Sequence, residues 1–199
     1  MEKVEINKNM KLSEHFTLGE MCKTKHVTAD GNIPSHVAIE NLKRICENWL
    51  EDLRYSYNML YVHSGVRPQS KVVAGVRPQS KVAGDCTLAP DPGAAPELGA
   101  AAVSRKEEPI VINSGYRSPE VNQLAGGATN SNHLTGCAVD IRCAGKEQMI
   151  RYASILLDIA DGSKQEYDEL LLEQHGSVCW LHFAVRPKEN RRIIRFLRV

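Results

Sequence analysis

Residues 131–140, Ser-Asn-His-Leu-Thr-Gly-Cys-Ala-Val-Asp, constrain the chain more than any other segment. They place an imidazole, His133, and a carboxylate, Asp140, seven residues apart, and a second imidazole follows at His182 in the sequence Trp-Leu-His. Two histidines and a carboxylate can hold Zn2+ while leaving one coordination position open, which is the arrangement of a catalytic rather than a structural zinc site. The sequence therefore predicts a zinc site formed by His133, Asp140 and His182.

Two predicted strands explain how these ligands meet. Residues 137–141 are small or β-branched, and strand alternation puts Asp140 on the face opposite its apolar neighbours. Residues 179–185 alternate in the same way, with His182 on one face. We expect the two strands to direct Asp140 and His182 to one point, with His133 entering from a loop that Gly136 allows to turn. A buried histidine bonded to a backbone carbonyl is the alternative for a single histidine, but the combined pattern favours a metal.

A series of motifs in the same order resembles a known family. The motifs occupy residues 12–17, 30–34, 114–118, 121–122, 126–128, 131–140 and 180–182. This set resembles the zinc D-alanyl-D-alanine carboxypeptidases and the related L-alanyl-D-glutamate endopeptidases, which include bacterial cell-wall enzymes and phage endolysins. The resemblance covers most of residues 10–62 and 107–186. It implies Zn2+ as the cofactor and the stem peptide of peptidoglycan as the substrate.

The resemblance also assigns residues to the substrate. Arg117 lies between a predicted strand at 109–113 and a helix start at Ser118-Pro119, so we expect it at a rigid corner. In the family this arginine is thought to bind a substrate carboxylate, a role that suits a permanently charged, bidentate guanidinium. The alternative is an arginine that pairs with a structural Asp or Glu. Ser131 is expected to steady the bound peptide.

Peptide hydrolysis also needs a carboxylate that takes the proton of the attacking water and passes it to the leaving amine. In several family members this residue is an acid three positions before the last histidine, and here that position is Cys179. Glu173 is the predicted substitute, ahead of Glu169 and Asp168. The strand register leaves this choice open, because one possible pairing places Glu169 opposite His182. The alternative for Glu173 is an exposed hairpin end.

The elements expected around the site indicate an α+β domain, with a small antiparallel sheet carrying the zinc site and helices packed on the other side. The first helix starts at Ser35 and has a buried stripe that reaches Leu53. A second helix spans 146–160 and is stopped by Gly162. The predicted strands, besides the one that carries Asp140, are 60–62, 109–113, 167–173 and 178–185, with a turn at 174–177 joining the last two.

Residues 63–106 have a different composition from the rest of the chain. The sequence Gly-Val-Arg-Pro-Gln-Ser-Lys-Val occurs at 65–72 and again at 75–82, and 13 of the 20 residues at 83–102 are Ala, Gly or Pro. Such a segment offers little apolar surface to bury. We interpret 63–106 as a low-complexity, disordered insertion in a single domain, residues 1–199, whose structured parts are 10–62 and 107–199. Alternatively, the insertion damages the fold and the chain is inactive.

Composition excludes several partners and suggests a compartment. The net charge of +1 gives no reason to expect nucleic acid, and no run of apolar residues reaches the roughly 18 needed for a membrane span. Six cysteines without a CxxC pair, together with an N-terminus without a signal-peptide pattern, suggest free thiols and cytoplasmic synthesis. Both a phage or prophage endolysin released by another protein and a cytoplasmic dipeptidase fit this expectation. We expect a monomer whose basic C-terminal residues guard an edge strand.

These observations predict a zinc-dependent peptidase that hydrolyses the peptidoglycan stem peptide, as a carboxypeptidase or as an endopeptidase. The second hypothesis is a non-catalytic, zinc-holding module that binds cell-wall peptides. Cys179, at the position usually held by an acid, is the feature that favours the second hypothesis.

Overall fold

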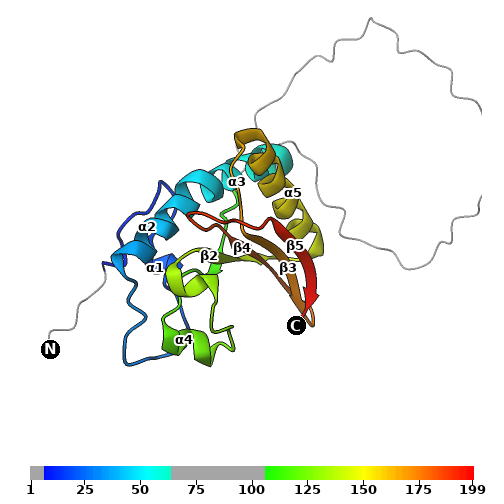
Figure 1. The fold of residues 1–199 in the computed structure, drawn as a ribbon. Helices are drawn as coiled ribbons and strands as arrows, with labels where there is room; N and C mark the ends of the chain where they lie inside the picture. Colours follow the sequence, from blue (N-terminus) through cyan, green and yellow to red (C-terminus); the bar gives the residue numbers. More distant parts are fainter. Residues whose placement is uncertain (1–6, 64–105) are drawn as a thin grey trace, which may run out of the picture.

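The structure is a computed structural model that describes residues 7–63 and 106–199. These residues form helices and one five-stranded sheet (Figure 1), as the predicted α+β class requires. The tandem repeat and the rest of the predicted insertion, residues 64–105, lie outside the described residues. Cys86 lies there too, while the other five cysteines are free thiols, as expected: Cys22, Cys46, Cys137, Cys143 and Cys179.

The first long helical run begins where the sequence predicts. Ser35 is the N-cap of α2 (His36–Ile45), and its hydroxyl accepts a hydrogen bond from the Ala38 backbone N–H. The run continues through η1 (Cys46–Leu50), α3 (Glu51–Tyr57) and η2 (Asn58–His63). Its buried side recurs at helical spacing, with Leu42, Ile45, Trp49, Leu50 and Leu53 almost fully covered. The predicted apolar stripe is therefore confirmed.

The predicted strand at 60–62 is wrong, because these residues lie in η2 and continue the helical run. A three-residue apolar segment does not distinguish a strand from a helix end. Here helical spacing brings Tyr61 onto Tyr57, with ring centroids 5.4 Å apart. The Arg151 guanidinium, from α5 (Lys146–Ser163), lies 4.2 Å from the centroid of the Tyr61 ring. Tyr61 is thus held against α3 and α5.

The sheet has the strand order β1-β2-β4-β3-β5. The strands are β1 (Ile112–Ser114), β2 (Ala138–Cys143), β3 (Glu169–His175), β4 (Val178–Ala184) and β5 (Ile193–Arg198). All neighbours pair antiparallel except β3 and β5, which are parallel, so the predicted antiparallel sheet is corrected to a mostly antiparallel one. The basic C-terminal segment forms the edge strand β5, as expected. β1 starts later than the predicted strand at 109–113, and it pairs only with β2.

The hairpin between β3 and β4 has a shorter turn than predicted. His175 pairs with Val178, so only two residues connect the strands, and Gly176 takes a positive φ of 57°. This register places Leu171 opposite His182. Glu169 and Glu173 lie two residues to either side of Leu171, so both share the sheet face of His182.

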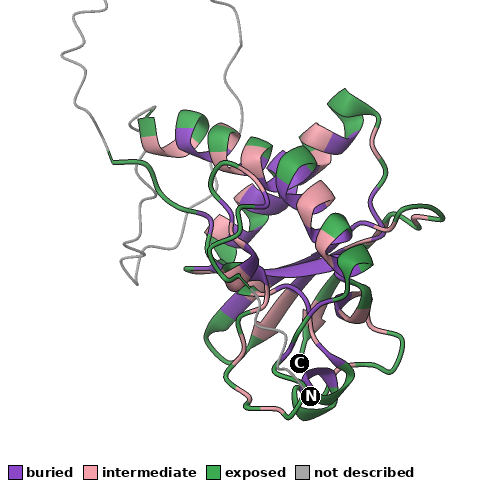
Figure 2. Ribbon diagram, turned by 90° about the vertical axis from the view of Figure 1, so that its left-hand side faces the viewer, coloured by how far each residue is buried: buried purple, intermediate pink, exposed green. Residues whose placement is uncertain are grey.

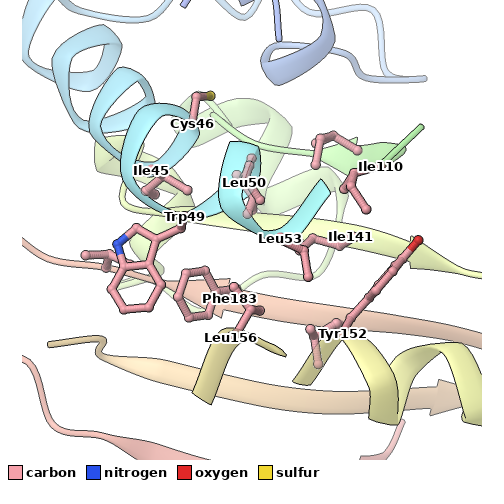
Figure 3. Packing of buried hydrophobic residues seen from close by; sticks show 14 of the residues in the cluster. Ile45, Cys46, Trp49, Leu50, Leu53, Ile110, Ile141, Tyr152, Leu156 and Phe183 are labelled. Carbon is pink, nitrogen blue, oxygen red and sulfur yellow. The ribbon is translucent and has the colours of Figure 1, made fainter. Parts of the chain in front are cut away.

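The opposite face of the sheet packs against the helices. Phe183 of β4 meets Trp49 edge to face, with ring centroids 5.0 Å apart at 61° (Figure 3). Buried residues gather on the sheet and on the sides of the helices that face it (Figure 2). The core contains residues from both described segments, from Leu12 to Tyr57 and from Ile110 to Val185. Since one face is filled by this core, the other face is left for a site.

Helix α5 extends beyond its predicted end. It continues through Gly162 to Ser163, and Lys164 ends it in the left-handed conformation with φ 57°. The predicted stop at Gly162 is therefore wrong, because the left-handed position two residues later is held by a lysine. None of the helices in residues 7–63 and 106–199 has the length and apolar character that a bilayer crossing requires.

Gly136→Ala is expected to destabilise the protein, whereas Gly162→Ala is not. Gly136 has φ 69°, and a Cβ there would lie 2.3 Å from the Ala38 carbonyl oxygen in α2. Backbone strain and this overlap together should lower the free energy of unfolding by about 2–4 kcal/mol. Gly162 lies in α5 with open space around its Cβ position, so alanine there should raise it by up to about 1 kcal/mol. Urea unfolding measures both changes, and equal midpoints for the two variants would contradict this packing.

Candidate metal centre

His133, Asp140 and His182 meet on the sheet face that points away from the helical core. Asp140 of β2 pairs directly with His182 of β4, and His133 approaches from η3 (Asn132–Thr135). The Asp140 Oδ1 atom lies 2.9 Å from His182 Nδ1 and 3.3 Å from His133 Nε2. Only 2% of His133, 6% of Asp140 and 9% of His182 is exposed. The three predicted ligands are thus neighbours in a nearly buried cluster.

The spacing of the ligand atoms fits a shared metal ion. A tetrahedral ion with bonds of about 2.0–2.1 Å separates its ligand atoms by about 3.3 Å. In this cluster the ligand atoms all lie within 4.8 Å of one another. His133 Nδ1 is 2.5 Å from the Gly115 carbonyl oxygen, and an N–H donated there leaves the Nε2 lone pair directed toward Asp140. This donor set, with the His133 ring held by the Gly115 carbonyl, suits a divalent metal such as Zn2+.

Two side-chain hydrogen bonds fix the short helix that carries His133. The Ser131 hydroxyl caps η3 by accepting a hydrogen bond from the His133 backbone N–H at 3.3 Å. Asn41 of α2 donates its side-chain N–H to the Thr135 carbonyl at 2.9 Å. Gly136 then turns the chain into β2 with a positive φ. Helix α2 therefore helps to position a loop of the site.

Arg117 lies at the predicted strand-to-helix corner. Ser118 caps α4 (Pro119–Leu124) and Pro119 occupies its first turn, as expected. The Arg117 guanidinium forms an ion pair with Asp140 Oδ2 and donates from Nε to Ser114 Oγ at 2.8 Å. The structure thus shows Arg117 against an acidic side chain of the protein, the alternative to a substrate carboxylate.

Asn32 supports this corner, a role that the turn motif at residues 30–34 does not reveal. It is 2% exposed, and its Oδ1 accepts a hydrogen bond from the Ser118 backbone N–H at 2.7 Å. Its Nδ2 donates to the carbonyls of Cys22 and Tyr116. Nearby, the Met21 carbonyl accepts from the backbone N–H groups of Gly115 and Tyr116. The N-terminal segment therefore holds the Arg117 corner in place.

Two of the clustered side chains, Asp140 and His182, have shifted pKa values. Burial on its own would raise the pKa of Asp140, but the charge and hydrogen bond of His133, and then those of His182, hold it well below its usual value. Burial would lower the pKa of His182, but its contacts with the Asp140 and Glu169 carboxylates raise it to about 9. Asp140 is therefore an ionised carboxylate between two imidazoles, the charge that a divalent cation needs.

A cleft of about 1000 Å³ opens above these three residues. Residues 23–26 and 125–128 line it, together with Arg117, Ser131 and Arg186. This volume is at the upper end of the range of ligand pockets, so a peptide fits it. All six residues predicted from the sequence to act in catalysis or binding line this cleft: Arg117, Ser131, His133, Asp140, Glu173 and His182.

Comparison with protein families agrees with this geometry. The family model described as Peptidase M15 matches residues 100–163, a range that holds Arg117, Ser131, His133 and Asp140. The match covers 64 of the 199 residues. The resemblance to zinc D-alanyl-D-alanine carboxypeptidases is thereby confirmed. No curated protein sequence matches the chain significantly.

The M15 match makes a metallopeptidase the supported class of enzyme, and the His-Asp-His cluster is a possible metal site of the kind such an enzyme needs. The match ends in α5, before His182 and the two glutamates of β3. Those residues are placed at the site by the fold. Strand β4 pairs with β2 of the matched range, and β3 pairs with β4.

Two glutamates of β3 face the cluster of His133, Asp140 and His182 in different environments. The His182 contact, followed by the charge of Arg191, lowers the pKa of Glu169 against the opposing effect of burial. Burial raises the pKa of Glu173 above its usual value, although the charge of His182 opposes the rise. Within residues 7–63 and 106–199, Glu173 forms no salt bridge, whereas Glu169 contacts both His182 and Arg191. Opposite shifts of this kind often mark different catalytic tasks.

The other two candidate positions for the base, Cys179 and Asp168, are buried and do not line the cleft. Cys179, at the position usual for the acid, faces the helical core opposite Cys143 and is 4% exposed. Asp168 is fully buried and accepts hydrogen bonds from Arg191 and Asn132. Glu173 thus remains the acid with a raised pKa that lines the cleft.

Asp168→Asn is expected to destabilise the protein most at neutral pH. Hydrogen bonds from Arg191 and Asn132 lower the pKa of Asp168 despite its burial, so its stabilising contribution is present above about pH 4, the ordinary range of an aspartate. That contribution is lost as the pH falls through the lower, folded-state pKa. Urea unfolding should show a deficit of about 1–3 kcal/mol at pH 7 that narrows below pH 4. A deficit that is the same at pH 7 and pH 3 would count against this ion pair.

Proposed function

We propose that this chain is a zinc-dependent peptidase that hydrolyses peptide bonds of the peptidoglycan stem peptide. The observation that carries the proposal is the convergence of His133, Asp140 and His182 at the base of a cleft large enough for a peptide. The peptidase M15 match over residues 100–163 supports the reaction class. The substrate follows from the resemblance to cell-wall peptidases.

The chemistry needs a metal-activated water and a proton carrier. Zn2+ held by His133, Asp140 and His182 would lower the pKa of a bound water to about 7 and would polarise the scissile carbonyl. Glu173 takes the proton of the attacking water and returns it to the leaving amine. Its raised pKa suits that task, because general acid–base catalysis is most efficient when the pKa of the group lies near the working pH. Glu173 is thus the proposed base.

Two further residues are proposed to contact the peptide. The Arg117 guanidinium has five N–H donors, of which Asp140 and Ser114 engage two, so others are left for a substrate carboxylate. The Ser131 hydroxyl accepts the His133 N–H, and its own hydrogen has no acceptor among the described residues, so it can donate to a peptide carbonyl. Lys23 and Lys25 at the edge of the cleft add positive charge that suits an anionic stem peptide.

Digestion of purified muropeptides, with and without a zinc chelator, tests the proposal. Mass spectrometry should show new amine ends that disappear with chelator and return when Zn2+ is added back. Release of terminal D-alanine identifies a carboxypeptidase, and cleavage after L-alanine identifies an endopeptidase. Binding of muropeptides without cleavage would instead support the non-catalytic module, and neither binding nor cleavage would contradict both functions.

A further inference from the structure

We infer that Glu169 is a positioning residue that decides which nitrogen of His182 is presented to the metal. The inference rests on the proposed metal site, but it concerns the glutamate that the proposed reaction leaves without a task. Glu169 and Glu173 lie on the same face of β3 with Leu171 between them, and only Glu169 contacts His182, Arg191 and Asn132 among the described residues.

The two nitrogens of the His182 ring face two different carboxylates. Nδ1 lies 2.9 Å from Asp140 Oδ1, the atom toward which His133 Nε2 also points. Nε2 lies 3.6 Å from Glu169 Oε2 on the other side of the ring. A neutral imidazole carries a single N–H, and a carboxylate beside Nε2 favours keeping the proton there. The Nδ1 lone pair is then directed to the point where the three ligands meet.

Glu169 is fixed by two further contacts. Its Oε2 accepts a hydrogen bond from the Asn132 side chain at 3.0 Å, and its Oε1 accepts one from Arg191 at 2.8 Å. Asn132 precedes His133 in η3. One carboxylate therefore links the elements that carry two of the proposed ligands.

Arg191 is itself anchored to a buried group. Its Nε and a terminal nitrogen donate to the two oxygens of Asp168 at 2.8 and 2.7 Å, the bidentate geometry of a strong ion pair. Asp168 is fully buried, so this anchor does not depend on a mobile surface contact. The contacts run from Asp168 through Arg191 to Glu169 and end at His182.

The same contacts make Glu169 a poor proton carrier. Its carboxylate pairs with the Arg191 cation and receives the Asn132 N–H, so both of its oxygens are engaged as acceptors. Glu173 has no salt bridge in the described part of the chain and lines the same cleft. The two acids thus have different roles: Glu173 transfers a proton, and Glu169 orients His182.

Zinc affinity separates these roles. Competition with a chromophoric chelator gives the dissociation constant of Zn2+ for each variant. Glu169→Ala should weaken binding about 10–100-fold, the range seen for outer contacts of metal-bound histidines. Glu169→Gln should recover part of this loss, because its carbonyl oxygen can accept the N–H of His182. Glu173→Gln should bind Zn2+ as the parent does.

Substitutions at the neighbouring residues Arg191 and Arg192 provide a test variant and its matched control for Zn2+ binding. Arg191→Gln should weaken Zn2+ binding because it releases Glu169, while Arg192→Gln should not, since Arg192 pairs with Asp161 and Glu166 at the surface. Nitrogen NMR of the zinc-loaded protein should show the His182 ring protonated at Nε2. The melting temperature of each metal-free variant is compared with that of the metal-free parent. A lowered value would indicate that the substituted residue has a structural role.

The outcomes separate failure of this inference from failure of the proposed function. No Zn2+ binding by the parent protein would overturn the proposed metal site itself. Tight binding by the parent together with equal binding by Glu169→Ala would overturn the positioning role alone. The role would also fail if Glu169→Gln bound as weakly as Glu169→Ala and both had a lowered metal-free melting temperature. Weakened binding by Glu169→Ala and partial recovery by Glu169→Gln, with unchanged melting temperatures, support it.

Discussion

Asp140→Asn is expected to remove both bound metal and peptidase activity. The Oδ1 atom of Asp140 lies between His133 and His182, so this carboxylate is the centre of the cluster. Asparagine keeps the shape but loses the negative charge that a divalent cation requires. Metal polarisation of the carbonyl is worth several kcal/mol, so we expect kcat/KM for muropeptides to fall by at least about 10³-fold.

Two further variants make this result interpretable. Arg142→Gln changes an exposed residue two positions further along β2 and should leave activity near that of the parent. Since Asp140→Asn also removes the partner of Arg117, His133→Gln provides a second ligand variant in which that ion pair persists. Circular dichroism checks that each variant is folded. A folded Asp140→Asn or His133→Gln protein with parental zinc content would show that the ligands lie elsewhere.

The Glu173→Gln variant is expected to keep its metal and lose catalysis. General acid–base catalysis contributes about 10²–10⁴-fold, and glutamine cannot carry the proton from water to the amine. The loss should fall on kcat, with little change in KM, because the side chain has its proposed role only in the transition state. Steady-state kinetics on a stem-peptide substrate, together with the zinc content, measures both quantities.

Glu166→Gln is the matched control, because Glu166 is exposed and contacts Arg192 away from the cleft. It should retain full activity. If Glu173→Gln turned over substrate within about threefold of the parent rate, far less than the loss of a general base, Glu173 would not be the base. Burial raises the pKa of Glu173, which makes that result unexpected.

The faces on which the proposed ligands lie were predictable because their signal is local. Alternation along residues 179–185 fixes the face of His182, and the same rule fixes that of Asp140. Strand pairing then needs only to put the two strands side by side, as β2 and β4 are. The helix caps at Ser35 and Ser118 were predictable for the same reason, since a cap depends on a few consecutive residues.

The register of the β3–β4 hairpin was not predictable from the sequence. The four residues at 174–177 permit more than one turn length, and the two-residue turn at Gly176 decides between them. With a four-residue turn Glu169 would lie opposite His182. With the observed two-residue turn Leu171 lies opposite His182, and a glutamate lies on each side of it. The assignment of the base among these acids therefore depended on tertiary structure.

The supporting residues had no sequence signal because their contacts are long-range. Asn32 bonds to Tyr116, 84 positions away, and Arg191 bonds to Glu169, 22 positions away. Asparagine and arginine are common at surfaces, so their type alone does not indicate a role. Arg117 shows the same limit, since its position at the corner was predicted but its pairing with Asp140 was only one of two alternatives.

One bound divalent ion per chain is the condition for everything proposed about His133, Asp140 and His182. Elemental analysis of protein purified from zinc-supplemented medium measures it directly. We predict one zinc per chain in the parent protein and little or none in the Asp140→Asn variant. Well-folded parent protein that carries no zinc, and takes up none when Zn2+ is added, would contradict the proposed site.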